Sequence, residues 1–159
     1  MFNTKKLIKM SKFSDYNKTF EDWENQGIIE EVEDVAKHNN VHYLTHHTVI
    51  KESSATTKSR PVFNGSLKDK NGNNLNDLLE KGPNLMERIP PLIVQFRLHK
   101  IGVTADIAKA VLQISLYEPD REYLIFLWWK DYSERSVKIY RHKRVVFGLK
   151  PSPFLLAAS

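Results

Sequence analysis

The chain has 159 residues, of which 41% are hydrophobic, and this length is enough for one globular core. It contains no cysteine, so neither a disulfide framework nor a thiolate metal site can form. No run of about 18 apolar residues predicts a transmembrane helix, and the lysine-rich start has no apolar stretch behind it to indicate a secretory signal.

The net charge of +5 is unevenly distributed. Residues 1–20 carry five lysines and one acid, residues 21–34 carry seven acids and no base, and residues 97–159 carry eleven basic against six acidic side chains. A basic second half suits a polyanionic partner, because neutralised phosphates supply much of the affinity for nucleic acid. An ordinary solvated surface explains the charge equally well.

Residues 14–26 are predicted to form an amphipathic helix. Tyr16, Phe20 and Trp23 recur at helical spacing and define its apolar side, and Gly27 stands at the position where helices commonly stop.

Residues 43–51 and 60–64 are predicted to form a β-hairpin, because two β-leaning stretches flank the polar segment ESSATTKS. Neighbouring residues on a strand point to opposite faces. The adjacent His46 and His47 are therefore not expected to share a metal.

A turn is predicted at Asn71-Gly72, followed by a short helix in LNDLLEK that Asn73 or Asn74 caps. A second helix is expected from Pro90 to about residue 100, with its apolar side chains inward: Leu92, Ile93 and Phe96. The stretch IGVTAD then predicts a strand that ends on an acid.

Two further strands are predicted in EYLIFLWW and over residues 137–146, followed by a turn around Gly148. Ser152-Pro153 should open a final helix, PFLLAAS. A chain that stops inside a capped apolar helix indicates a truncated domain, and a terminal helix docked on the core is the alternative.

Asp106 is the first candidate functional residue, since a carboxylate delivered to a strand end is suited to hold Mg²⁺. A helix cap or a turn residue explains a single aspartate as well, and two-metal chemistry needs more than one carboxylate. The cations Lys51, Lys58 and Arg60 beside the hairpin could neutralise a triphosphate, or could belong to a solvated hairpin. In FGLKPSPF, Gly148 permits a close backbone approach.

The order and wording of these pieces carry more information than any one of them. The chain reads YLTHHTVIKESSATTKSRPVFNGS, NNLNDLLEKGPNL, FRLHKIGVTADIAKAVLQISL, YLIFLW and VFGLKPSPFLLAAS in turn. This series resembles the reverse transcriptase of BEL/Pao-class LTR retrotransposons over about residues 15–159.

The resemblance implies an α+β fold with right-hand polymerase fingers and a partial antiparallel palm, truncated before the catalytic hairpin. Residues 1–14 are then expected to be a poorly ordered basic segment, and residues 15–159 to be the incomplete fingers and palm.

The resemblance also implies roles for single residues. Asp106 matches the first metal-binding aspartate of the palm, which in the complete enzyme helps to hold two Mg²⁺ ions, with Mn²⁺ as an alternative. Val111 stands where such enzymes carry an aromatic residue against the sugar, so the usual discrimination against a ribose 2′-OH is not expected. The other matches are the triphosphate-binding residues Lys51, Lys58 and Arg60, the nucleotide-lining Phe147 and Gly148, and Lys150 on the template and primer.

The function implied is that of a fragment of an RNA-directed DNA polymerase, which would use a template-primer of RNA or DNA and dNTPs. The chain has no Tyr-x-Asp-Asp-like motif and no protease, RNase H or integrase region, so we expect it to be inactive alone. No membrane partner is expected. The expected location is intracellular, in a cytoplasmic particle or the nucleus. The alternatives are a non-catalytic nucleic-acid-binding remnant and an unrelated small α+β interaction protein that holds Asp106 buried and bonded.

Overall fold

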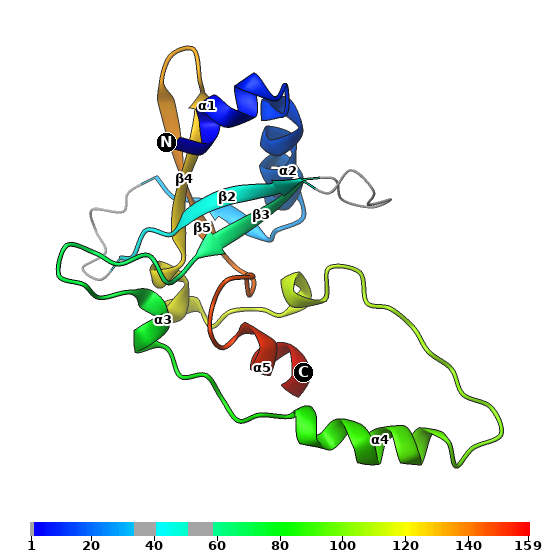
Figure 1. The fold of residues 1–159 in the computed structure, drawn as a ribbon. Coiled ribbons are helices and arrows are strands. Elements are labelled where there is room, and N and C mark those ends of the chain that lie inside the picture. The colour runs from blue at the N-terminus through cyan, green and yellow to red at the C-terminus, as the bar shows by residue number, and fades with distance from the viewer. Residues whose placement is uncertain (1, 34–40, 51–58) are drawn as a thin grey trace.

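The computed structural model describes residues 2–33, 41–50 and 59–159 and has an α+β fold, as the sequence predicts. An antiparallel sheet has the strand order β1-β5-β4, and a separate antiparallel hairpin joins β2 to β3 (Figure 1). The strands are β1 (Ile29–Glu31), β2 (Thr45–Ile50), β3 (Ser59–Asn64), β4 (Ile125–Asp131) and β5 (Ser136–His142).

The described ranges also contain five α-helices and three short 3-10 helices, joined by turns and loops. None of these helices is long and apolar enough to cross a membrane. The α-helices are α1 (Phe2–Lys9), α2 (Phe13–Asn25), α3 (Leu75–Leu78), α4 (Ile89–Phe96) and α5 (Ser152–Ala158), and the 3-10 helices are η2 (Met86–Arg88), η3 (Ala110–Gln113) and η4 (Glu118–Tyr123).

Helix α2 confirms the amphipathic pattern in the sequence. Tyr16, Phe20 and Trp23 are all buried on its inner side. Gly27 ends the helix with φ +64°, a left-handed conformation that glycine adopts without steric cost. The backbone N–H of Ile28 then donates to the carbonyl of Trp23, at 2.9 Å, and turns the chain toward β1.

Helix α1 lies within residues 1–14, the segment predicted from the sequence to be basic and poorly ordered. Helix α1 occupies most of it and places Leu7 in the core, with 1% of the side chain exposed. Trp129 on β4 donates its indole N–H to the hydroxyl of Thr4, at 3.0 Å. The indole bond connects helix α1 to the sheet, and Leu7 adds to the core.

The core is organised around five rings packed in tilted and edge-to-face arrangements, called here the ring cluster: Phe20, His46, Phe63, Phe126 and His142. Each ring comes from a different element, α2, β2, β3, β4 and β5. The centroid distances are 5.1 Å for Phe20–Phe126, 5.5 Å for His46–Phe63, 5.0 Å for Phe63–Phe126 and 4.4 Å for Phe63–His142. The ring cluster therefore joins the hairpin to both α2 and the three-stranded sheet.

His46 adds directional bonds to this packing. Its Nδ1 lies 2.8 Å from the hydroxyl of Tyr16, and its Nε2 lies 3.1 Å from the carbonyl oxygen of Leu127. A carbonyl only accepts, so Nε2 carries the proton and Nδ1 accepts from Tyr16. His47 is exposed on the other face of the strand, in agreement with the alternation that the sequence predicts.

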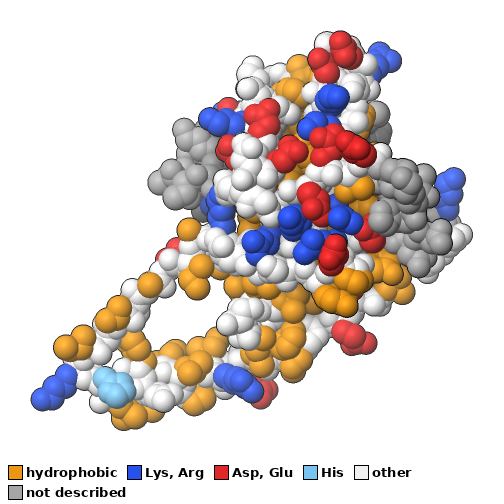
Figure 2. Space-filling model, turned by 180° about the vertical axis from the view of Figure 1, so that it is seen from behind, with side chains coloured by type: hydrophobic (Ala, Val, Ile, Leu, Met, Phe, Trp, Pro, Cys, Tyr) orange, Lys and Arg blue, Asp and Glu red, His pale blue; other side chains and the backbone are white. Residues whose placement is uncertain are grey.

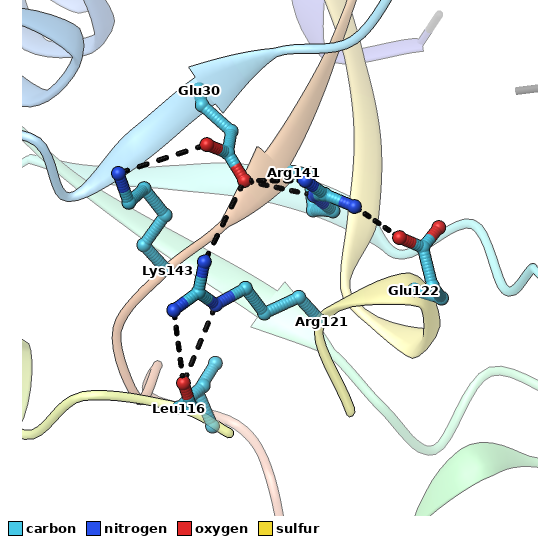
Figure 3. Close-up of polar contacts among 6 residues, drawn as sticks. All are labelled: Glu30, Leu116, Arg121, Glu122, Arg141 and Lys143. Carbon is cyan, nitrogen blue, oxygen red and sulfur yellow. Dashed lines mark hydrogen bonds and ion pairs between the residues drawn. The ribbon is translucent and has the colours of Figure 1, made fainter. Parts of the chain in front are cut away.

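A charged network fastens β1 and η4 to β5 (Figure 3). Arg141 donates to Glu30 from Nε at 2.9 Å and also binds Glu122. Lys143 lies 3.6 Å from the second carboxylate oxygen of Glu30. Arg121 approaches Glu30 at 3.9 Å and donates to the Leu116 carbonyl, so one carboxylate connects three cations.

Two predictions about the middle of the chain are wrong. Helix α4 forms as expected, but its side chains Leu92, Ile93 and Phe96 are 59%, 47% and 48% exposed instead of facing inward. Residues 101–107 form no strand and are exposed, because a strand requires a partner and the described residues offer none there. Figure 1 shows the stretch between α4 and η3 looping away from the strands.

The buried histidines make stability depend on pH. Burial lowers the pKa of His142 to about 3 and that of His46 to about 4. In the unfolded chain both side chains titrate near pH 6.5, so the unfolded state binds more protons below that pH. Their contribution to stability is therefore complete above about pH 6.5 and is lost as the pH falls toward 4, by up to about 1.4 kcal/mol per unit for each histidine.

We predict that His142→Phe reduces the slope of unfolding free energy against pH between 6 and 4.5, by about 1.4 kcal/mol per unit. Phenylalanine keeps a ring against Phe63 and Phe126 but takes up no proton. Urea unfolding followed by tryptophan fluorescence at several pH values measures the slope. His47→Gln, at an exposed position, is the control. An unchanged slope in His142→Phe, or an equal change in the control, would contradict the prediction.

Candidate functional site

The candidate site begins where the loop Phe147–Lys150 meets strand β3. Gly148 has φ +105°, and a Cβ atom built on it would lie 1.8 Å from the carbonyl oxygen of Phe63. Only glycine fits such a contact, because any side chain would displace the backbone of β3. The sequence prediction that Gly148 permits a close backbone approach is confirmed, and its partner is the hairpin.

Asn76 holds this loop in place from helix α3. Its side-chain Nδ2 donates to the carbonyl oxygen of Gly148 at 3.0 Å and to the hydroxyl of Ser66 at 2.8 Å. Its Oδ1 accepts from the backbone N–H of Lys150 at 2.8 Å. One amide side chain thus bonds both sides of the loop, which fixes its position against β3.

The local sequence explains why Asn76 points this way. Asn74 caps α3, since its side chain accepts from the backbone N–H of Asp77 at 3.0 Å. Leu75 is buried, and the backbone N–H of Asn76 donates to the carbonyl of Gly65 at 2.8 Å. The cap and the buried leucine orient the first turn so that Asn76 faces the loop.

Sequence reasoning predicted the cap at Asn73 or Asn74 but missed the role of Asn76. The signal was present in the LND block, where two asparagines flank a single leucine. A polar side chain beside a buried residue in a short helix has to find partners outside the helix, and here they come from residues 72 and 74 positions later.

Arg60 lies on the outer face of β3. The burial of the strand alternates, with Ser59 and Phe63 inward and Arg60 exposed opposite Val49 of β2. Phe63 follows Arg60 by three positions along the strand, a distance of about 10 Å. The hairpin therefore carries this guanidinium on the strand that Gly148 contacts. Lys51 and Lys58, the two other predicted cations, lie outside the described residues.

Phe147 and Lys150 display their side chains at the loop. The ring of Phe147 is 56% exposed, and Lys150 is exposed while its backbone N–H is held by Asn76. The loop thus presents an aromatic face and a cation from a fixed backbone. An exposed ring can stack on a base, and an ammonium can neutralise a phosphate.

Val111, which the resemblance places against the sugar of the nucleotide, is buried. It is 2% exposed on η3, which packs against α5. The segment after it runs beside residues 143–145, where the Val145 N–H donates to the Ile114 carbonyl and the Leu116 N–H to the Lys143 carbonyl, both at 2.9 Å. The valine serves here as a core residue.

Asp106 is exposed within residues 101–107, which form no strand. Within residues 2–33, 41–50 and 59–159, no group of three or more His, Cys, Asp or Glu side chains is placed to hold a metal ion. A lone exposed carboxylate does not fit two Mg²⁺ ions, so we derive no catalytic step through a metal.

The structure thus brings together β3, α3 and the loop at Gly148, with Arg60, Phe147 and Lys150 at the surface, while Asp106 lies in an exposed segment without a strand. In sequence comparisons the chain matches no protein-family model and no curated protein.

We predict that Asn76→Ala destabilises the protein by about 1–3 kcal/mol and accelerates hydrogen exchange at the Lys150 amide. Alanine removes the acceptor of that amide and the donor to Gly148. Urea unfolding and amide exchange measured by NMR test the two effects. Asn71→Ala, in the exposed turn before α3, is the control and should change neither. An unaltered Lys150 exchange rate in Asn76→Ala would refute the role of Asn76.

Proposed function

We propose that this chain is the fingers and part of the palm of an RNA-directed DNA polymerase of the BEL/Pao kind, and that as it stands it binds a template-primer without extending it. The observation that supports this most is the contact between β3 and the loop at Gly148. Two blocks of the resemblance, far apart in sequence, meet there and are fastened by Asn76 from a third block.

The chemistry of the surface is consistent with nucleic acid as the ligand. Arg60 offers a planar guanidinium suited to phosphate oxygens, Lys150 a second cation, and Phe147 an exposed ring for a base. These groups stand on a strand and an anchored loop rather than on free chain. Fixed donors lose less conformational freedom on binding than mobile ones do.

The lack of turnover follows from the carboxylates. In-line transfer of a nucleotidyl group needs metal ions clamped on both the attacking and the leaving oxygens. Asp106 is one carboxylate in an exposed segment, and the described residues contain no group of three or more His, Cys, Asp or Glu side chains placed to hold a metal ion. Binding and catalysis therefore separate in this chain.

An unrelated α+β interaction protein remains the second candidate function. It would hold Asp106 buried and bonded as a structural residue, whereas Asp106 is exposed. The exposure argues against a structural Asp106, and the absence of a strand over residues 101–107 departs equally from the polymerase resemblance, so Asp106 favours neither function.

We predict that the purified protein binds a fluorescein-labelled poly(rA)·oligo(dT) duplex in a salt-dependent manner, and that Arg60→Ala weakens binding about tenfold. Fluorescence anisotropy at several salt concentrations measures both. Lys9→Ala, which removes the same charge from α1, is the control and should cost much less. Absence of salt-dependent binding would overturn the proposal. If Arg60→Ala and Lys9→Ala lost the same affinity, the binding would depend on net charge and not on the position of Arg60.

We further predict that the same protein incorporates no dTTP on this duplex with Mg²⁺ or Mn²⁺, because one carboxylate cannot hold both ions. A gel-based primer-extension assay measures incorporation. Asp106→Asn should leave the affinity for the duplex unchanged. Clear metal-dependent extension that Asp106→Asn abolishes would show that the chain is catalytic.

A further inference from the structure

A groove of about 750 Å³ lies between α5 on one side and η2 with α4 on the other. It is separate from the outer face of the hairpin, and Lys150 is the one candidate site residue that lines it. Most of its lining is apolar, and the side chains that matter here are Pro83, Met86, Ile89, Leu92, Phe154 and Ala157.

The two walls differ in how they are held. On the α5 side, the ring of Phe154 packs on the backbone of Gly82, where an added Cβ would lie 2.3 Å from the ring. On the α4 side, Met86, Ile89 and Leu92 are 70%, 48% and 59% exposed. The first wall is fixed, and the second presents unpartnered apolar side chains. Figure 2 shows hydrophobic side chains gathered over this part of the molecule.

The charge of the groove has one sign. Lys81, Arg88 and Lys150 line it, and none of its lining residues is acidic. Three cations surround an apolar floor. They repel an apolar ligand that carries positive charges and attract one that carries carboxylates beside its apolar surface. The partner is therefore both apolar and anionic.

We propose that this groove binds an amphipathic α-helix of a partner protein, whose apolar stripe is flanked by acidic residues. A helix laid between two helices packs with axes 8–10 Å apart and inserts its i, i+3, i+4 and i+7 side chains. Phe154 is the only aromatic residue that lines the groove, and its ring is already packed on Gly82, which disfavours base stacking. The concave shape disfavours insertion into a lipid surface.

The probe is a fluorescein-labelled 16-residue amidated peptide with leucines at i, i+3, i+4 and i+7 and glutamate and alanine elsewhere. Fluorescence anisotropy with the intact chain should give binding in the micromolar range. A matched peptide with lysine for glutamate should bind at least tenfold more weakly, and one with serine for leucine should not bind. Equal binding of the glutamate and lysine peptides would overturn the proposal.

Peptide affinities of protein variants test whether the peptide binds in the groove. Leu92→Ser should weaken the acidic peptide at least fivefold, and Arg88→Gln should weaken it and flatten its salt dependence. Val103→Ser, which removes an aliphatic side chain that is 82% exposed outside the groove, is the matched control. The proposal fails if Leu92→Ser has no effect or if Val103→Ser has the same effect.

The affinity for poly(rA)·oligo(dT) is measured on the same samples and should be unchanged in Leu92→Ser. If the protein bound the peptide but not the duplex, only the polymerase proposal would be contradicted. If it bound the duplex but not the peptide, only the groove proposal would be contradicted.

Discussion

Contact between the hairpin and the rest of the protein depends on the ring cluster. The outer face of β2 and β3 is exposed, so the hairpin keeps its place through its inner side chains, above all Phe63, which lies 5.0 Å from Phe126 and 4.4 Å from His142. Removing a ring of this kind from a core costs about 3–5 kcal/mol. Two of the five rings are imidazoles that have to stay neutral, so the same contact that positions Arg60 also carries a sensitivity to acid.

The ring cluster also positions the candidate site, through Phe63. Phe63 directs its ring into the ring cluster while its carbonyl oxygen receives Gly148, so a single residue connects the packing of the hairpin to the loop. Asn76 then closes the assembly from α3. A shift of β3 would move the loop and Lys150 with it. The positions of the exposed cations Arg60 and Lys150 therefore depend on the buried Phe63, which lies about 10 Å from Arg60 along the strand.

Elements with a strong local pattern were predictable, and elements that need a distant partner were not. The spacing of Tyr16, Phe20 and Trp23 predicts α2, and the β-leaning runs predict the hairpin, β4 and β5, because each pattern records its own buried face. The stretch IGVTAD has the composition of a strand but has no neighbour to pair with among the described residues, so propensity alone was misleading. Asn76 was missed since its bonds reach residues more than 70 positions away.

The same distinction explains the contrast between the two halves of the molecule. Helix α2 and the strands contribute apolar side chains to one core, while α4 and residues 97–107, which loop away from the strands in Figure 1, expose theirs. The sequence of helix α4 is typical of a core helix because it is apolar on more than one side. A helix of that kind is stable in water only when another surface covers it. The prolines in its first turn, Pro90 and Pro91, fix the backbone there without supplying that cover. Burial of Met86, Ile89 and Leu92 by a partner would therefore complete an arrangement that the helix sequence already specifies.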